Sequence, residues 1–384
     1  MALLLSIGPT VRPCRPQAVN NAGALFLSLP VGARAVGMGQ TAVALAGRGE
    51  AAFWNPAGLA TMPESEFALE SASLAAGASH ALTAYFHSHG IGVIGGAVYL
   101  LDYGDLDRTD STNNTIARIS PRNLEFLASY ATELGSSLTL GINYKLVEFR
   151  VDCSGDCRDF PGGQGVTNGV DIGGQLAVGA DGALRVGVAV RNIGFKLQVN
   201  NRDQADALPA RLVIGALYRL ALHVERGAAG GSGDGIDVNL AADVDSRWGS
   251  YGDSQMRLGV DVGYQRMLRV RGGYAFVRDG LSGPCVGMGV TSGAIGVDLA
   301  RSFLSSSDFV ADNRWRWSAG RPASARGWAG GRGRGTRGRR RGGASGSDPS
   351  LPFFFPAQVS SCLTRTARRD TSPLNFTPWS ATSN

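Results

Sequence analysis

Apolar residues recur at every second position over most of the chain between residues 66 and 319. The stretch LTLGINYKL, residues 138–146, is typical: its even-numbered positions are Leu, Leu, Ile, Tyr and Leu, and its odd-numbered positions are Thr, Gly, Asn and Lys. The same alternation is found in residues 184–191, 236–245 and 256–264. A period of two is that of a β-strand, in which successive side chains point to opposite faces. The chain is therefore predicted to be all-β.

The alternation predicts about fourteen strands, an even number. They are expected at residues 66–74, 79–88, 91–102, 123–133, 137–150, 169–178, 183–193, 209–220, 235–246, 255–265, 267–277, 284–291, 294–302 and 312–319. The connections after the second, fourth, sixth, tenth and twelfth strands are tight. Those after the third, fifth and seventh are long, at residues 103–122, 151–168 and 194–208, and the connection after the eighth strand is the exception to this sorting.

Two folds agree with alternation alone. A soluble antiparallel sandwich turns its apolar residues inward, whereas a transmembrane barrel turns them toward lipid and keeps a polar or small-residue lumen. Short turns on one side and long loops on the other are typical of outer-membrane barrels, and a closed barrel leaves no unpaired edge in lipid. The predicted fold is an all-β, transmembrane antiparallel β-barrel over residues 63–319. No apolar run reaches the roughly 18 residues that a membrane-spanning helix needs.

The stretch ARAVGMGQTAVALAGRGEAAFWNPAGLA, residues 33–60, precedes the first strand and is rich in Gly and Ala. Within it, TAVALAG has helical propensity, and Asn55 followed by Pro56 is typical of a helix N-cap and first helical position. Gly and Ala would allow close approach to a barrel wall. Residues 19–62 are therefore predicted to form a plug inside the lumen.

This stretch resembles the N-terminal signature of the PorV/PorQ outer-membrane proteins, within the wider superfamily of FadL-type long-chain fatty-acid transporters. The matching positions are Gly32, Ala33, Arg34, Ala35, Gly37, Met38, Gly39, Trp54, Asn55, Pro56, Ala57 and Gly58. The resemblance covers roughly residues 24–319 and implies a plug before a fourteen-stranded barrel. Trp54 is closer to the PorV/PorQ pattern, whereas GRGE at residues 47–50 replaces an acidic pair often seen before the Trp segment.

In FadL-type proteins the Asn-Pro-Ala motif belongs to a luminal hatch that gates the passage of an apolar substrate. The resemblance therefore assigns a ligand-binding or gating role to plug residues. The candidates are Arg34, Gly37, Met38, Gly39, Trp54, Asn55, Pro56 and Ala57.

The charged residues of the strands fall on the face opposite the apolar one. Those expected to face the lumen are Arg185, Arg191, Arg211, Arg257, Arg269, Arg271, Asp243, Asp261 and Asp298. A charge-compensated network is a simpler interpretation of these residues than a catalytic group. No enzymatic activity, cofactor or metal site is predicted.

The basic character of the chain lies at its C-terminal end. Of 37 basic and 31 acidic residues, 11 Arg and 2 Asp fall within residues 320–384, which leaves 26 basic and 29 acidic residues before them. This tail is low in complexity, and an RGG-like RNA-binding segment, a disordered extension and a frame-shifted or read-through end are its three interpretations. We favour the last, and no nucleic-acid partner is predicted.

Two segments indicate export. Cys153 and Cys157, in VDCSGDC, are expected to form a local disulfide in an oxidising compartment, because the four His residues offer no second ligand pair for zinc. MALLLSIG at the N-terminus resembles the end of a secretory signal, so residues 1–18 are predicted to be its remnant.

These observations predict a monomeric barrel in lipid of the bacterial outer membrane, with two possible functions. The PorV resemblance implies a component of type IX secretion that holds secreted cargo proteins by their C-terminal domain. The alternative is a passive, FadL-like channel for hydrophobic small molecules, with an apolar pocket near Met38 and Trp54. The three long loops suit a protein partner better than a lipid without deciding between these functions.

Overall fold

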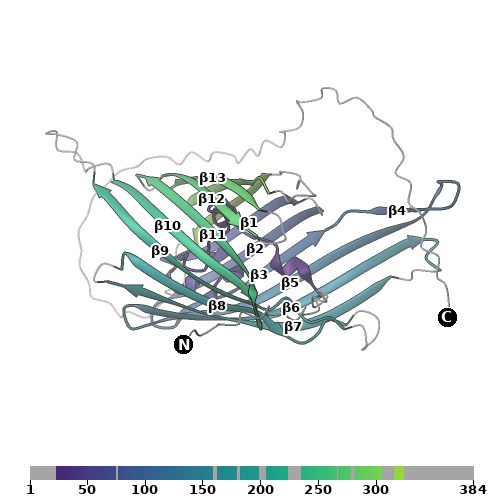
Figure 1. Ribbon diagram of the computed structural model, residues 1–384, viewed down its shortest axis with the longest axis horizontal. Coiled ribbons are helices and arrows are strands. Elements are labelled where there is room, and N and C mark those ends of the chain that lie inside the picture. The colour runs from purple at the N-terminus through teal and green to yellow at the C-terminus, as the bar shows by residue number, and fades with distance from the viewer. Residues whose placement is uncertain are drawn as a thin grey trace, which may run out of the picture. The chain divides into compact units, whose positions relative to one another are not determined.

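The computed structural model describes residues 23–74, 77–158, 162–179, 182–198, 205–223, 235–265, 267–277, 282–304 and 315–323. Its strands form one antiparallel sheet (Figure 1). The strands are β1 (Ser65–Leu74), β2 (Gly77–Ser88), β3 (Gly92–Asp102), β4 (Leu106–Thr109), β5 (Thr115–Leu134), β6 (Leu138–Gly155), β7 (Gly163–Val178), β8 (Leu184–Gly194), β9 (Arg211–His223), β10 (Gly235–Arg247), β11 (Ser250–Tyr264), β12 (Leu268–Phe276), β13 (Gly283–Ser292), β14 (Ile295–Ser302) and β15 (Trp315–Ala323).

The strand pairings run around a ring. Apart from β3 and β4, strands that follow one another in sequence pair with each other, and β1 pairs with β15. β3 pairs with β5, from Asp102 opposite Arg122 to Val93 opposite Ala131. The short strand β4 pairs with β5 alone, beyond the end of β3. Fourteen strands thus make up the ring, as the alternation predicts. Backbone groups are paired within the sheet, which a lipid environment requires.

The two faces of the wall are inverted relative to a soluble β-protein. Along β6, Leu140, Ile142 and Tyr144 are 41%, 46% and 52% exposed, whereas Asn143 and Lys145 are 0% and 3% exposed. A soluble sandwich would bury the first set and expose the second. The inversion therefore confirms the barrel interpretation of the alternation.

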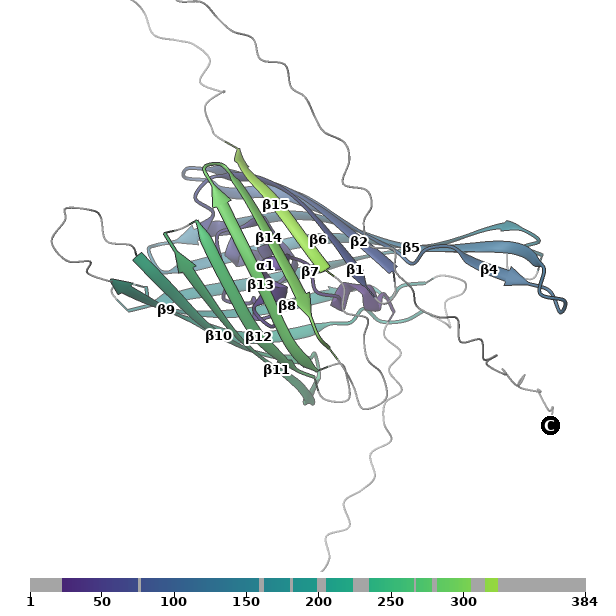
Figure 2. The same ribbon diagram turned by 90° about the horizontal axis from the view of Figure 1, so that it is seen from above.

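Two of the three predicted long loops are mostly strand, so this part of the prediction is wrong. β5 begins at Thr115 and β6 continues to Gly155, and together with β4 they extend away from the other strands (Figure 2). This extension pairs residues 115–119 with residues 106–109 on one side and residues 117–122 with residues 150–155 on the other. It shows no clean apolar alternation, because neither of its faces contacts lipid or the plug.

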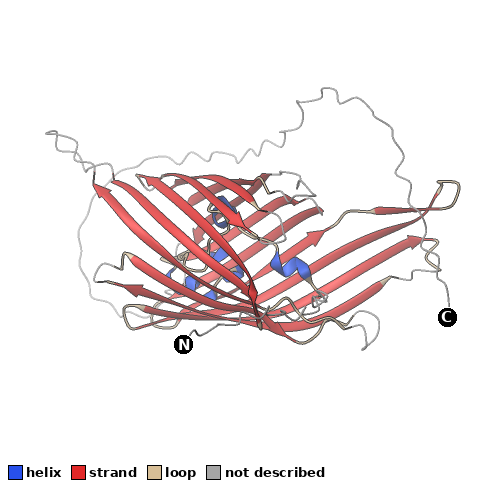
Figure 3. Ribbon diagram, in the orientation of Figure 1, coloured by secondary structure: helices blue, strands red, loops and turns tan. Residues whose placement is uncertain are grey.

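The N-terminal residues lie on the inner side of the ring, where helices are surrounded by strands (Figure 3). These helices are α1 (Ala33–Gly37) and the 3-10 helices η1 (Leu25–Ser28), η2 (Gly49–Phe53) and η3 (Pro56–Thr61). Helix α1 contacts β12–β15, and η3 contacts β3 and β5–β7. No helix in the described part of the chain is long and apolar enough to cross a membrane.

The largest buried apolar cluster lies between these N-terminal residues and the wall. It includes Phe26, Met38, Leu45 and Trp54 from the N-terminal residues and Tyr99 from β3. The ring of Tyr99 stacks on Phe26 and meets Phe53 edge-on, with centroid distances of 6.1 Å in both pairs. The apolar core of this protein is therefore the contact between the N-terminal segment and the wall.

Parts of both ends of the chain lie outside the residues that the structure describes. β15 continues to Ala323, four residues beyond the predicted end of the last strand. The predicted signal remnant at residues 1–18, the start of the predicted plug, and the tail beyond residue 323 lie outside the described residues.

Candidate functional site

The plug, defined here as residues 23–64, is held to the wall by polar side chains that bind its backbone. Asp243 on β10 accepts hydrogen bonds from the amides of Ala42 and Val43, at 2.7 and 3.0 Å. Gln175 on β7 donates to the carbonyls of Val43 and Leu45, at 3.0 and 2.8 Å. This turn of the plug is therefore fixed from two sides of the barrel.

The predicted helix over TAVALAG does not form, because residues 42–46 are turn or irregular structure. Their amides and carbonyls bind Asp243 and Gln175 of the wall, which leaves them unavailable for the i to i−4 bonds of a helix. Tertiary hydrogen bonds here override a weak local propensity.

Asn55 has two roles in the plug. As predicted, it caps a helix: its side-chain Oδ1 accepts from the amide of Ala57 at 3.1 Å, and Pro56 is the first residue of η3. Its Nδ2 donates to Val43 of the plug at 2.7 Å and also reaches the carbonyls of Gly174 and Val188, at 3.2 and 3.3 Å. The fully buried Asn55 thus joins two parts of the plug to β7 and β8.

Seven strands of the wall present glycine where the plug passes closest. These glycines are Gly141, Gly173, Gly187, Gly215, Gly259, Gly273 and Gly287. A Cβ at Gly173 would overlap Asn55, one at Gly141 would overlap Pro56, and one at Gly259 or Gly273 would overlap Met38. Glycine at these positions is what lets the plug backbone touch the wall. Sequence reasoning assigned the small residues of the plug to this contact but not their partners on the strands.

One cluster of buried charges belongs entirely to the wall. Lys145 on β6 lies 2.9 Å from Glu125 on β5, 3.0 Å from Asp171 on β7 and 2.8 Å from the side-chain oxygen of Asn192 on β8. All four side chains are buried. Next to them, Asn143 and Arg191 donate to the plug carbonyls of Ala52 and Phe53, both at 2.7 Å. Of this cluster, only Arg191 was among the predicted lumen charges.

A second cluster includes a charge of the plug itself. Asp261 on β11 binds Arg269 at 2.6 Å and Arg271 at 3.2 Å, and Arg271 binds Asp298 on β14 at 2.5 Å. Arg48 of the plug makes an ion pair with the same Asp298. These contacts bring together four of the predicted lumen charges.

The remaining predicted lumen charges face inward in different surroundings. Arg211 and Arg257 bind Asp245, which sequence reasoning did not single out, at 2.6 and 3.1 Å. Arg185 is half-buried and lines a separate cavity of about 140 Å³ with Glu133, so it joins neither cluster.

The predicted apolar pocket near Met38 and Trp54 is wrong. Met38 is fully buried, and Trp54 is 6% exposed and donates its ring N–H to the carbonyl of Val31 at 2.8 Å. The guanidinium of Arg191 lies 5.5 Å from the centroid of the Trp54 ring. The cavity beside Trp54 and Arg34 measures about 10 Å³, room for a single water at most. These residues are core, because the plug fills the space that a ligand would need.

The remaining plug candidates make backbone contacts. Arg34 donates to the carbonyl of Ala46 at 3.1 Å, within the plug. Gly37 touches Gly287, and Gly39 lies against β11 and β12 with a φ of 69°, in the left-handed region that favours glycine. Ala57 is fully buried next to Gly141. The structure thus brings the predicted plug residues together as a contact surface with the wall.

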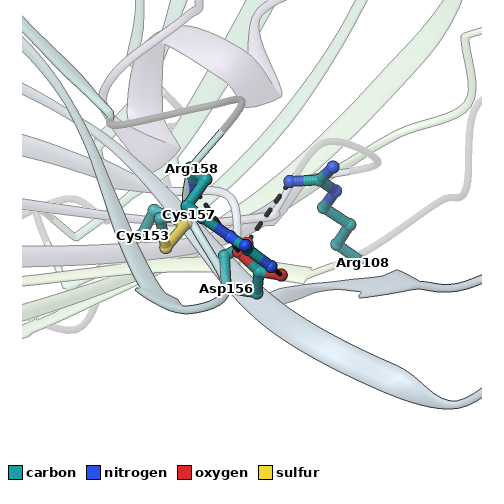
Figure 4. The surroundings of a disulfide bond; sticks show 5 residues. All are labelled: Arg108, Cys153, Asp156, Cys157 and Arg158. Carbon is teal, nitrogen blue, oxygen red and sulfur yellow. Dashed lines mark hydrogen bonds and ion pairs between the residues drawn. A yellow bond between two sulfur atoms is a disulfide. The ribbon is translucent and has the colours of Figure 1, made fainter.

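Cys153 and Cys157 form a disulfide at the end of β6 (Figure 4). Arg158 binds the carboxylate of Asp156 through two hydrogen bonds of 2.9 and 2.7 Å, and Arg108 donates to the carbonyl of Asp156 at 3.3 Å. The hydrogen bonds from Arg158 lower the pKa of Asp156 to about 2. The structure places the two predicted cysteines next to each other as a bonded pair.

Solved structures share this fold. The toluene transporter TbuX of Ralstonia pickettii is 13% identical, with a TM-score of 0.50 over 76% of this chain and 98% of its own. The toluene transporter TodX of Pseudomonas putida is 12% identical, with a TM-score of 0.50 over 76% and 98%. The monoaromatic hydrocarbon channel CymD is 14% identical, with a TM-score of 0.51 over 76% and 97%. At these identities the likeness concerns the fold alone.

The sequence comparison gives the family. No curated protein sequence matches the chain. The family model described as "Type IX secretion system protein PorV" matches residues 14–229, more than half of the chain. This match covers the plug and the first nine strands. The chain therefore belongs to the PorV family of bacterial outer-membrane barrels.

Proposed function

We propose that this barrel serves type IX secretion by holding secreted cargo proteins, while its lumen remains closed by the plug. The observation that carries the proposal is the close contact between the plug and glycines on seven strands of the wall. A plug that touches the wall backbone on so many sides acts as a core. The close contacts lie on β6–β9 and on β11–β13, so half of the strands of the ring hold the plug directly.

The polar contacts support a fixed plug. Wall side chains on β6, β7, β8, β10 and β14 bind it, as does Glu66 on β1, which accepts from the amide of Gly49 at 2.8 Å. A buried hydrogen-bonding group left without its partner costs about 1–3 kcal/mol. Moving the plug as a unit would break many such bonds at once, so passage through the lumen carries a high free-energy cost.

The projecting strands offer a surface for a protein partner. β4, β5 and β6 extend beyond the ring at the end opposite the short turns of residues 89–91 and 135–137. Short turns are periplasmic in outer-membrane barrels, so the projection is on the extracellular side. Its surface ion pairs include Arg118 with Asp107 at 3.4 Å and Arg150 with Asp152 at 2.8 Å. Such a polar, extended sheet fits a secreted protein better than a hydrocarbon.

Uptake of hydrophobic small molecules is the alternative, and two observations favour it. The structures similar in fold are a pair of toluene transporters and a monoaromatic hydrocarbon channel. An apolar groove of about 720 Å³ lies on the outer face of the wall, and its lining includes Leu184, Ala216, Tyr218, Leu240, Leu258 and Tyr274. That groove faces lipid, and the plug lies behind it at Gly259 and Gly273.

Native mass spectrometry tests the two functions on protein extracted from its own outer membrane in mild detergent. A secreted protein bound in stoichiometric amount, with no small molecule in the barrel, is the expected result. A co-purifying hydrophobic molecule without protein cargo would overturn the proposal and support uptake. The same spectrum gives the mature mass, which tests the predicted signal remnant and the tail.

A disulfide that locks the plug separates the functions directly. Ala33→Cys in α1 and Ala300→Cys in β14 replace two alanines that belong to one buried cluster and already carry a Cβ, so an oxidised pair would join the plug to β14. A cargo-holding barrel would keep its cargo after the lock is oxidised. A channel that opens by moving the plug would lose uptake on oxidation and regain it on reduction.

A further inference from the structure

A cavity of about 310 Å³ opens at the short-turn end of the barrel, between the plug, β1 and the turn that joins β13 to β14. Its lining residues are Gly47, Arg48, Glu50, Pro63, Glu64, Glu66, Ala68, Glu70, Thr291, Gly293, Ala294, Ile295 and Gly296. The short turns lie on the periplasmic side, so the cavity faces the periplasm. It lies at the opposite end of the barrel from the projecting strands proposed to meet cargo.

The lining of this cavity is strongly acidic. Four carboxylates, from Glu50, Glu64, Glu66 and Glu70, surround it, and Arg48 is its only basic lining residue. Arg48 is already paired with Asp298, which is not part of the lining. The acidic lining residues therefore outnumber the basic ones four to one.

Two of these carboxylates are deeply buried and have an oxygen without a hydrogen-bond partner. Glu50 is 7% exposed and Glu70 is 6% exposed, and the unpartnered atoms are Oε1 of Glu50 and Oε2 of Glu70. Arg34 forms an ion pair with Glu50, with 3.8 Å between Nη1 and Oε1, a distance too long for a hydrogen bond. Buried carboxylates require donors or a neighbouring cation. Both side chains line the cavity, so a group bound there lies next to them.

We propose that this cavity binds a guanidinium group presented from the periplasm. A guanidinium carries five N–H donors in a planar fork, which suits recognition by more than one carboxylate. Among the described residues no group of three His, Cys, Asp or Glu side chains is placed to hold a metal ion, so an organic cation fits better than a divalent metal. The cavity is large enough for one arginine side chain and too small for a folded domain.

The two deep carboxylates and the outer ones have different tasks in this site. Glu50 and Glu70 lie at the buried side, where they accept hydrogen bonds from the guanidinium. Glu66 is half-buried and Glu64 is exposed, so they attract the cation from solvent and bind the outer side of the group. The site does not depend on the cargo-holding function.

Isothermal titration calorimetry on the full chain in a zwitterionic detergent tests the proposal. The probes are N-acetyl-arginine methylamide and its citrulline counterpart, which has the same shape without the charge. We expect one arginine probe per barrel and binding of the citrulline probe weakened by about tenfold or more. Equal binding of the two probes, or no binding of either, would overturn the proposal.

Variants locate the site. Glu70→Gln and Glu66→Gln keep the size of the side chain, and each is expected to weaken binding of the arginine probe by about tenfold. The control is Glu133→Gln, at the same end of the barrel but in the separate cavity with Arg185, which should change affinity less than about twofold. If Glu70→Gln does not fold, Glu66→Gln alone decides, and an affinity unchanged from the parent protein would refute the site.

The source of the guanidinium is distinguished by a second pair of probes. Tighter binding of a glycyl-arginyl-glycine peptide than of agmatine indicates an arginine side chain of a polypeptide. Tighter binding of agmatine indicates a free small molecule. Both outcomes support the guanidinium site, whereas binding of sodium or calcium in preference to either probe would contradict it.

Discussion

The plug is held differently on the two sides of the barrel. On the β5–β8 side, the buried charges of Lys145, Glu125 and Asp171 all belong to the wall. The plug contributes uncharged groups there, which are backbone carbonyls and the side-chain amide of Asn55. On the β10–β14 side, Arg48 of the plug is itself a member of the ion-pair cluster at Asp298. On the first side the wall binds uncharged groups of the plug, whereas on the second side the binding depends on the charge of Arg48 in the plug. Effects of ions or ligands on the plug should therefore arise on the second side.

The glycine contacts are common to both sides and should give the largest effects. Gly173→Ala adds a methyl group that would overlap Asn55, so we expect a loss of about 3 kcal/mol in the free energy of unfolding, or failure to assemble. Gly174→Ala is the matched control, because its new Cβ would point outward and meet nothing closer than 3.5 Å. Urea unfolding and heat-modifiable mobility on gels measure both variants. Equal behaviour of the two would mean that the plug does not lie against β7.

The wall cluster should give the next largest effect. Lys145→Met leaves Glu125 and Asp171 buried without their cation, and the expected loss is about 3 kcal/mol in the free energy of unfolding. The chain supplies its own control, since its other lysine, Lys196, is exposed. Lys196→Met should change stability by less than about 0.5 kcal/mol. Similar losses in both variants would show that Lys145 is not in a buried cluster.

The plug ion pair should be weaker than the wall cluster. Arg48→Gln removes one partner of Asp298, but Arg271 still binds that carboxylate, so a loss of about 1.5 kcal/mol is expected. Arg118→Gln, at an exposed pair on the projecting strands, should cost less than about 1 kcal/mol. Urea unfolding at low and high salt sharpens the comparison of the two sides. High salt should lower the free energy of unfolding of the parent protein toward the value of Arg48→Gln. An equal salt response in Arg48→Gln would argue against the ion pair.

Removal of the disulfide should have the smallest effect on the stability of the barrel. Cys153→Ser with Cys157→Ser frees the end of β6, beyond the ring that the plug fills. The expected result is an unchanged urea midpoint together with faster protease cleavage between residues 150 and 165. A lowered midpoint would mean that the projecting strands and the ring unfold as one unit.

Much of the ring could be predicted from the sequence. A period of two depends on backbone geometry and on the difference between lipid and lumen, both of which act locally on each strand. The segments that break this pattern were missed because the difference between lipid and lumen does not act on them. β4 and the start of β5 lie beyond lipid and plug, where nothing imposes alternation, so residues 103–122 were predicted to be a loop.

The sequence alone determined the strand number, the inward face of the charged residues, the Asn55 cap and the Cys153–Cys157 pair, since each depends on neighbours in the chain. Only the tertiary structure decided which charges meet, because Lys145, Asp171 and Asn192 are brought together by strand register. It also decided that Met38 and Trp54 are core and that residues 42–46 are not helical. Both outcomes depend on partners far away in the sequence: wall glycines such as Gly259, and side chains such as Asp243, that meet the plug only when the ring has formed.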